Sequence, residues 1–177
     1  RSHVVLVSGK RGCLTEDTRI FTDKGYKQIK EFDKFKDKIL SYDKHNNQFE
    51  WEYAELLEYR ISNEKLLEIE LDDKRTIKLT KEHPLLVCTG KEVLSLLWRT
   101  ADKLSIGDNL LSVNDSFSDV NPVSIKTIKE VTGISKVYDL TVNKNHSFIA
   151  NGIISHNSGK SYTLGVIAEE LSSLEGE

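Results

Sequence analysis

Two groups of residues near opposite ends of the chain are suited to breaking and making peptide bonds. Cys13 supplies a thiol, a strong nucleophile as the thiolate, and follows Gly12, which has no side chain to obstruct attack on its carbonyl. The second group is His156-Asn157-Ser158. The amide nitrogen of Asn157 can attack its own carbonyl and cleave the next peptide bond, with His156 as general acid or base. The hydroxyl of Ser158 can accept an acyl group. The Gly12–Cys13 and Asn157–Ser158 peptide bonds, called the first and second junctions below, therefore both carry residues suited to cleavage and acyl transfer.

The same junctions divide a phosphate-binding loop. Such a loop reads G-x-x-x-x-G-K-[ST] between a strand and a helix; its amides hold phosphate, its Lys neutralises charge and its hydroxyl binds magnesium. The chain contains Gly9-Lys10-Arg11-Gly12 and, much later, Ser158-Gly159-Lys160-Ser161. Joining Gly12 to Ser158 gives GKRGSGKS, a full match, so residues 13–157 read as an insert. The alternative is two unrelated loops rich in glycine and lysine.

The patterns of the flanks differ from that of the insert. Val4–Val7 is an apolar run that predicts a buried strand, and 161–174 has the apolar spacing of a helix. In the insert, Asp23-Lys24-Gly25 separates two short apolar runs, which predicts a hairpin. Further strands are expected at 39–42, 48–61, 66–71, 76–79, 85–87, 125–128, 137–142 and 148–149, with a helical turn at 100–104 and a loose connection at 112–122. Many short strands predict an all-β domain.

Composition argues against several classes of protein. With 25 Lys and Arg against 28 Asp and Glu, the net charge of −3 argues against a polybasic module for nucleic acid or membrane surfaces. No apolar run reaches about 18 residues, and the N-terminus lacks the core of a signal peptide. Cys13 and Cys88 are too few for a disulfide framework, so we expect reduced thiols and a cytoplasmic location. Cys88 is expected in the core, a redox lock with Cys13 being the alternative. The missing initiator Met indicates a fragment.

The insert resembles an intein, a self-splicing protein element. Its motifs occur in the family's order: Cys13-Leu14 with 17–20, Thr80–His83, 137–142 with 146–152, and His156–Ser158. The resemblance implies the horseshoe-shaped all-β fold shared with hedgehog autoprocessing domains, the HINT fold, which brings the two ends of the insert together. Residues 84–136 are too few for a homing endonuclease, so the insert is similar to a mini-intein.

The resemblance also implies roles for residues at the first junction. His83 would protonate the departing amide nitrogen of Cys13 and strain the Gly12–Cys13 bond. Thr80 would support His83 or hydrogen-bond the oxyanion. Asp139 would coordinate the two junctions through Cys13, since a partly buried carboxylate near a thiol can hold its proton.

At the second junction, the resemblance implies that His146 and His156 assist cyclisation of Asn157. An oxygen-to-nitrogen acyl shift at Ser158 would then restore a peptide bond. Splicing of this kind needs no cofactor, no metal in the insert and no partner, because the protein contributes chiefly positioning.

The joined flanks, 1–12 and 158–177, resemble the phosphate loop of HerA-type DNA-translocating ATPases. The resemblance implies that Lys160 contacts the β- and γ-phosphates of ATP, that Ser161 binds Mg²⁺, and that amides from Gly9 to Gly159 wrap the phosphates. ATP and Mg²⁺ would then be cofactors of the spliced host, which would bind DNA, form oligomers and have no membrane span.

Two other functions remain open from the residues. In the first, the chain is a fragment of a nucleotide-binding enzyme with an inert insert, and the unspliced chain binds ATP. In the second, a hedgehog-like domain cleaves its upstream segment without ligation. That reading predicts a thioester at Gly12–Cys13 that added thiols trap, with no joined product.

Overall fold

The computed structural model describes residues 3–6, 12–90, 95–114, 116–117 and 119–157. They form sixteen strands and two short 3-10 helices, η1 (Ile29–Glu31) and η2 (Ala101–Lys103). The strands are β1 (His3–Leu6), β2 (Leu14–Thr15), β3 (Arg19–Thr22), β4 (Gly25–Gln28), β5 (Ile39–Asp43), β6 (Gln48–Glu52), β7 (Ala54–Arg60), β8 (Leu66–Leu71), β9 (Thr76–Leu79), β10 (Pro84–Thr89), β11 (Ser95–Thr100), β12 (Asn109–Val113), β13 (Val120–Val131), β14 (Lys136–Val142), β15 (Ser147–Ala150) and β16 (Ile153–His156). The predicted all-β class is confirmed.

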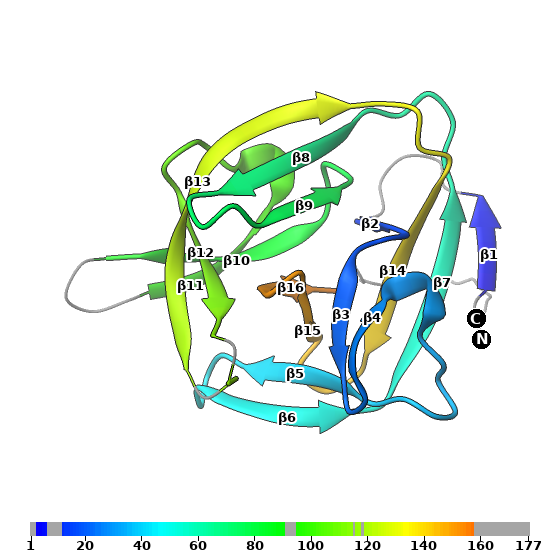
Figure 1. Cartoon of the computed structure of the whole chain (residues 1–177), viewed down its shortest axis with the longest axis horizontal. Coiled ribbons are helices and arrows are strands. Elements are labelled where there is room, and N and C mark those ends of the chain that lie inside the picture. Colours follow the sequence, from blue (N-terminus) through cyan, green and yellow to red (C-terminus); the bar gives the residue numbers. More distant parts are fainter. Residues whose placement is uncertain (1–2, 7–11, 91–94, 115, 118, 158–177) are drawn as a thin grey trace.

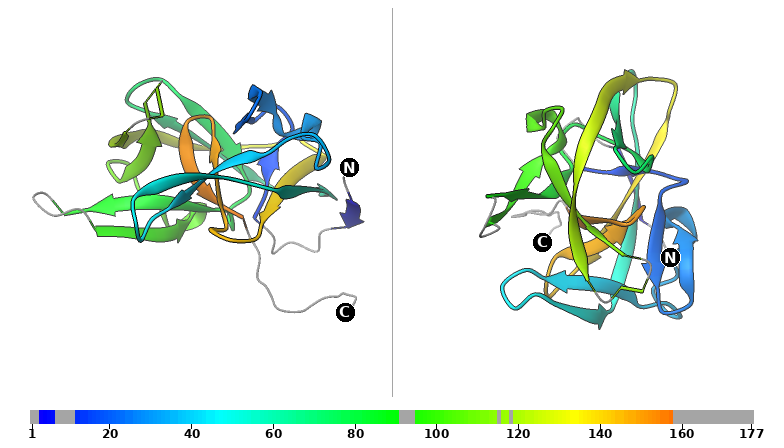
Figure 2. Two further views of the ribbon diagram at one scale, coloured as in Figure 1. Left: turned by 90° about the horizontal axis from the view of Figure 1, so that it is seen from below. Right: turned by 60° about the vertical axis from the view of Figure 1, so that its left-hand side comes forward.

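The strands join into one continuous, strongly curved sheet. Its order is β1-β7-β14-β2-β9-β8-β13-β12-β10-β16-β15-β3-β5-β6, with β11 paired to β10 and β4 paired to β3. The pairs β8/β13, β7/β14 and β5/β6 form a rim around β2, β15 and β16 (Figure 1). The β10–β11 hairpin extends away from this centre (Figure 2). The first and last strands of the expected insert therefore both lie in the middle of the horseshoe.

Alternation of apolar side chains builds the core from these strands. Across the β8–β9 pair, Ile69 lies opposite Ile77 and Leu67 opposite Leu79, and all four side chains are buried. Each such side chain contributes about 1.5–3 kcal/mol by leaving water. Because successive strand residues point to opposite faces, the intervening charged residues stay at the surface.

Several sequence predictions are corrected by the pairing. The single strand expected over 48–61 is wrong: β6 pairs with β5 whereas β7 pairs with β14, so the chain changes partner at Tyr53. The loose connection expected over 112–122 is too long, because Ser112 pairs with Asn121 and donates its hydroxyl to the Asn121 carbonyl at 3.0 Å. The strand expected at 125–128 is the middle of the longer β13. The helical turn near 100–104 is confirmed as η2.

Of the two elements expected in the flanks, the structure describes the N-terminal strand only. The apolar run near the N-terminus appears as β1, which pairs in parallel with β7 from His3 opposite Leu57 to Leu6 opposite Arg60. The helix expected at 161–174 lies outside the described residues. Among the described residues, no helix is long and apolar enough to cross a membrane.

A tight turn sends β16 back into the centre of the fold. Asn151 and Gly152 have φ angles of 51° and 79°, both left-handed, as the two-residue hairpin turn between antiparallel strands requires. This turn pairs β15 with β16 from Ser147 opposite His156 to Ala150 opposite Ile153. The end of β16 is thereby carried to the site described below.

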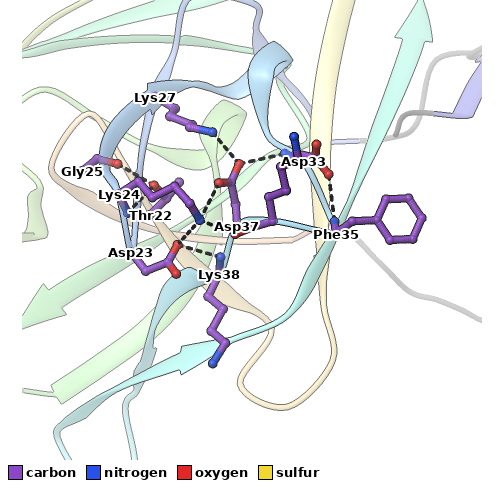
Figure 3. A network of polar contacts seen from close by, with 10 residues as sticks. Thr22, Asp23, Lys24, Gly25, Lys27, Asp33, Phe35, Asp37 and Lys38 are labelled. Atoms are coloured by element: carbon purple, nitrogen blue, oxygen red, sulfur yellow. Dashed lines mark hydrogen bonds and ion pairs between the residues drawn. The ribbon is translucent and has the colours of Figure 1, made fainter.

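A buried carboxylate ties the segment between η1 and β5 to the β3–β4 hairpin (Figure 3). The side chain of Asp37 is fully buried and lies 2.8 Å from Lys27 Nζ and 3.2 Å from Lys24 Nζ. Oδ2 of Asp37, the oxygen that faces Lys27, also accepts the backbone N–H of Asp33 at 2.9 Å. Burial opposes ionisation, but Lys27, the Asp33 amide and Lys24 together hold the pKa of Asp37 below its ordinary value.

Replacing Asp37 with Asn should lower the free energy of unfolding by about 2 kcal/mol at pH 7, because a buried, charge-assisted network loses its anion. A carboxylate whose pKa is lower in the folded state stabilises above its unfolded pKa, about 4, and that contribution disappears as the pH falls through the folded pKa. The difference between parent and variant should therefore shrink from pH 5 to pH 2. Urea titrations across that range check this. The exposed Asp72→Asn variant serves as control, and a difference that persists at pH 2 would contradict the electrostatic explanation.

Candidate active site

The turn from Thr80 to His83 holds the backbone of Cys13. The N–H of Cys13 donates to Thr80 Oγ1 at 2.8 Å, and the N–H of Thr80 donates to the Cys13 carbonyl at 2.9 Å. Within the turn, the N–H of His83 donates to the Thr80 carbonyl at 3.2 Å, and the His83 carbonyl accepts the N–H of Ala101 in η2 at 2.9 Å. The geometry places Thr80 on the amide that would become the leaving group at the first junction.

Gly12 lies directly against this turn. A Cβ added to Gly12 would lie 2.6 Å from His83 Cα and 3.0 Å from both the His83 nitrogen and the Glu82 carbonyl oxygen. All three are backbone atoms, so no side-chain rotation could make room. Only glycine therefore fits at this position, and the backbone of Gly12 packs directly against that of His83.

The Cys13 side chain is fully buried, in a cluster with Tyr59, Ile61, Leu66 and Val137. Such an environment excludes bulk water, so a thioester formed there would be sheltered from hydrolysis.

His83 is a fully buried, neutral imidazole. Burial lowers the pKa of His83 to about 3, the backbone of Gly12 raises the pKa against that effect, and His156 lowers it further. A backbone group raises the pKa of an imidazole by accepting a hydrogen bond from the protonated ring. The Gly12 group that faces the ring is therefore its carbonyl oxygen and not its N–H. Ring nitrogen Nε2 contacts the hydroxyl of Ser155, and Nδ1 has no hydrogen bond of ordinary geometry to a described residue.

Asp139 lies on β14 next to the first junction. Strand β14 pairs with β2 with Tyr138 opposite Leu14, and one further step in this register sets Asp139 opposite Cys13. The Asp139 side chain is 1% exposed, and its Oδ1 accepts the N–H of Leu140 at 2.9 Å. The expected link between Asp139 and Cys13 is thus compatible with the strand register.

At the other junction, backbone carbonyls orient the Asn157 side chain. Asn157 is 5% exposed, and its N–H donates to the His146 carbonyl at 2.9 Å. With the side-chain amide assigned by its neighbours, Nδ2 donates to the carbonyls of His146 at 2.9 Å and Val142 at 3.3 Å. Two acceptors fix the nitrogen that would attack the Asn157 carbonyl, and Val142 ends the strand that carries Asp139.

His156 contacts the carbonyl that this nitrogen would attack. Nδ1 of His156 is in hydrogen-bond contact with the Asn157 carbonyl oxygen. The ring is held between Trp98, edge to face at a centroid distance of 4.7 Å, and His146, nearly stacked at 5.8 Å. A donor on this oxygen stabilises the negative charge that develops when the carbonyl is attacked.

The turn that carries His146 is clamped by two glutamates of β6. Glu52 accepts the backbone N–H groups of Lys144 at 2.9 Å and Asn145 at 3.2 Å. Glu50 accepts from Lys144 Nζ at 2.6 Å and from Asn145 Nδ2 at 3.1 Å. The next residue, His146, has a φ of 57°, so these contacts hold it in a left-handed conformation that few side chains adopt freely.

The structure brings the expected residues together in two adjoining groups. Gly12, Cys13, Thr80 and His83 form one, and His146, His156 and Asn157 form the other. The His83–Ser155 contact joins them, and Asp139 lies on β14, whose last residue, Val142, contacts Asn157. The remaining expected residues, Ser158, Gly9, Gly159, Lys160 and Ser161, lie outside the described residues.

The site residues expected from the sequence did not include Ser155, Trp98, Glu50 or Glu52. Only Ser155 carried a local signal, since Asn151-Gly152 followed by apolar residues is typical of a hairpin whose second strand includes it.

Cys88 is buried among apolar side chains with Tyr42, in a different cluster from that of Cys13, and burial raises the pKa of its thiol to about 11. Both thiols are free, which fits core packing for Cys88. No described group of three or more His, Cys, Asp or Glu could hold a metal ion.

Most of the chain matches a known family. A family model described as the pretoxin HINT domain matches residues 19–161. The chain belongs to the HINT family. An uncharacterized protein of Methanocaldococcus jannaschii is 30% identical over 86 residues, which cover 49% of this chain and 11% of that protein. The HINT chain thus spans only a small part of the length of that curated relative.

Solved structures of inteins share the fold. An intein from a hyperthermophile superposes with a TM-score of 0.72 at 18% identity, covering 82% of this chain and 99% of that one. The DnaB intein from Synechocystis sp. PCC 6803 gives a TM-score of 0.67 at 26% identity, covering 83% and 99%. The DnaX mini-intein from Spirulina platensis gives 0.66 at 26%, covering 82% and 99%. The expected horseshoe HINT fold is confirmed, and these similarities support a HINT domain of the mini-intein type.

Proposed function

We propose that this HINT domain splices itself out of a host protein, excising residues 13–157 and joining Gly12 to Ser158. Similarity to inteins supports autocatalytic splicing. One observation carries the proposal: Gly12 lies against the backbone of His83, while the His83 ring contacts Ser155 on β16, two residues before Asn157. A single buried site thus adjoins Gly12 and the segment that leads to Asn157, the two residues after which splicing must break the chain.

In the first step, the Cys13 sulfur attacks the Gly12 carbonyl. The carbon–sulfur bond forms, the Gly12–Cys13 amide bond breaks, and the thiol proton ends on the released amine. Asp139, opposite Cys13 in the strand register, takes the proton from sulfur, and Thr80 holds the amide nitrogen that leaves. His83 assists departure of the amine at the same bond.

In the later steps, the Ser158 hydroxyl takes the acyl group from sulfur to give an ester. Nδ2 of Asn157 then attacks its own carbonyl, which breaks the Asn157–Ser158 bond and leaves a succinimide. His156 polarises that carbonyl, and His146 orients the nitrogen through its own carbonyl. The ester finally rearranges to an amide because the freed amine of Ser158 attacks it intramolecularly.

The host proposal rests on the sequence of the flanks alone. Residues 1–12 and 158–177 belong to a HerA-like ATPase, and splicing restores its phosphate loop. After splicing, Lys160 contacts the ATP phosphates and Ser161 binds Mg²⁺. The host binds DNA, forms oligomers and is cytoplasmic, and splicing itself needs neither cofactor nor partner.

Intact-mass spectrometry of the purified chain, incubated under reducing conditions from cool to hot, tests the function. Splicing converts the 20.2 kDa precursor into free 13–157 and a peptide in which Gly12 is linked to Ser158. Separate flanks without a joined peptide would support a hedgehog-like cleavage and contradict ligation. A chain that stays whole but binds ATP would favour the inert-insert reading, and ATP binding only after splicing would support the host proposal.

A further inference from the structure

Ser155 is a buried serine whose hydroxyl faces the ring of His83. Its side chain is fully buried on β16, where Ser155 pairs with Leu85, two residues beyond His83. Its Oγ is in hydrogen-bond contact with His83 Nε2, and it has no other hydrogen-bond partner among the described residues. The pair lies 72 positions apart in the sequence, so only the fold brings it together.

The surroundings of the ring select one of its two neutral tautomers. A neutral imidazole carries one proton, so one nitrogen donates and the other accepts. If Nε2 carried the proton, the lone pair of Nδ1 would be left to face the Gly12 carbonyl oxygen, and two acceptors would repel each other in a buried site. If Nδ1 carries it, the ring donates toward Gly12, and Nε2 accepts the proton of the Ser155 hydroxyl. This second arrangement gives Nε2 a donor and turns the Nδ1 proton toward an acceptor.

We propose that Ser155 is a positioning residue for the first junction: its hydroxyl donates to Nε2 of His83, fixing the proton on Nδ1, where it faces the Gly12 carbonyl oxygen. That oxygen becomes negatively charged when Cys13 attacks, so a fixed donor stabilises the transition state. Because β16 ends at His156 and Asn157 follows directly, the same hydroxyl links His83 to the strand that leads to the second junction. The inference rests on the proposed splicing function.

Two half-reactions of the full chain, one at each junction, distinguish a role of Ser155 in positioning His83 from a general role in holding β16 in place. In an Asn157→Ala background, added dithiothreitol releases residues 1–12 and reports only the first junction. In a Cys13→Ala background, succinimide formation reports only the second junction. Adding Ser155→Ala should slow the first about 10- to 100-fold, the size of effect seen when a metal-ligating histidine loses its orienting partner, and change the second less than about threefold.

Two further variants sharpen the comparison. Ser155→Thr keeps the hydroxyl and should recover most of the first rate. Ser112→Ala removes another buried serine hydroxyl, from a strand that pairs with β16, and should leave both rates near those of the parent. Equal slowing of both half-reactions by Ser155→Ala would assign Ser155 a structural role only and overturn the proposal, as would no slowing at all.

The tautomer of His83 can be measured by NMR in a chain that cannot splice. In the Cys13→Ala/Asn157→Ala precursor with ¹⁵N-labelled histidine, two-bond nitrogen–proton correlations should show His83 protonated at Nδ1, and Ser155→Ala should redistribute the proton. Protonation at Nε2 in the parent would overturn the inference. If the unsubstituted chain neither cleaves nor splices, the proposed function fails, and this spectrum still decides the assignment of the Ser155–His83 pair.

Discussion

Replacing Asn157 with Ala should abolish release of the downstream flank, slowing it by at least about 1,000-fold. The substitution removes the nitrogen that attacks the Asn157 carbonyl, and no other group can take its place because a nucleophile acts through the bond it forms. His156 would still contact the carbonyl. The carbonyls of His146 and Val142 would each lose the side-chain donor, whereas His146 would keep the backbone N–H of residue 157. The first junction depends on separate residues and should remain active.

The variant should therefore stop at the thioester or ester stage. These isomers have the mass of the precursor, so intact mass alone should stay constant. Dithiothreitol should then release residues 1–12 as a thioester, at a rate set by Cys13. Asn46→Ala, at an exposed turn where the side chain bonds Asp43, serves as a control that should splice like the parent. Release of the 158–177 flank from the Asn157→Ala chain at the parent rate would contradict the assigned nucleophile.

The chemistry of the junctions could be predicted because it depends on residue type and local order. A thiol directly after Gly12, and an Asn directly before Ser158, indicate candidate reacting groups without any knowledge of the fold. Short apolar runs also predicted most strands, because alternation is a local property of a half-buried sheet. The strand expected over 48–61 was wrong because its pattern does not show that the pairing partner changes at Tyr53.

The long-range contacts of the site could not be predicted in the same way. Ser155 reads locally as one small residue in an apolar strand, and its contact with His83 follows from the pairing of β16 with β10. Glu50 and Glu52 read as exposed strand residues, yet they bind a turn more than 90 positions away. Partner choice in a sheet depends on how every strand packs. The sequence alone therefore proposes candidate reacting atoms but not the groups that contact and orient them.

Substituting Gly12 with Ala should slow formation of the thioester about 100-fold. The added methyl would lie 2.6 Å from His83 Cα, closer than nonbonded carbons approach, and the neighbouring contacts at 3.0 Å are also backbone atoms. The turn around His83 cannot yield easily, since it is bonded to Cys13 on one side and to η2 on the other. The Gly12 carbonyl must then move away from the Cys13 sulfur, and a displacement of about 1 Å can cost about a hundredfold in rate.

The second junction provides the control within the same molecule. Asn157 is oriented by His146 and Val142, whereas a Cβ added to Gly12 would meet His83 and Glu82. Succinimide formation in a Gly12→Ala/Cys13→Ala chain should therefore stay within about threefold of that in Cys13→Ala alone. Dithiothreitol-induced release of residues 1–12, compared between Gly12→Ala/Asn157→Ala and Asn157→Ala, measures the first junction. Unchanged release would mean that the upstream flank binds the site differently from the described contact. Selective loss at the first junction would show that close backbone packing at Gly12, beyond the chemistry of Cys13, sets the rate of the first step.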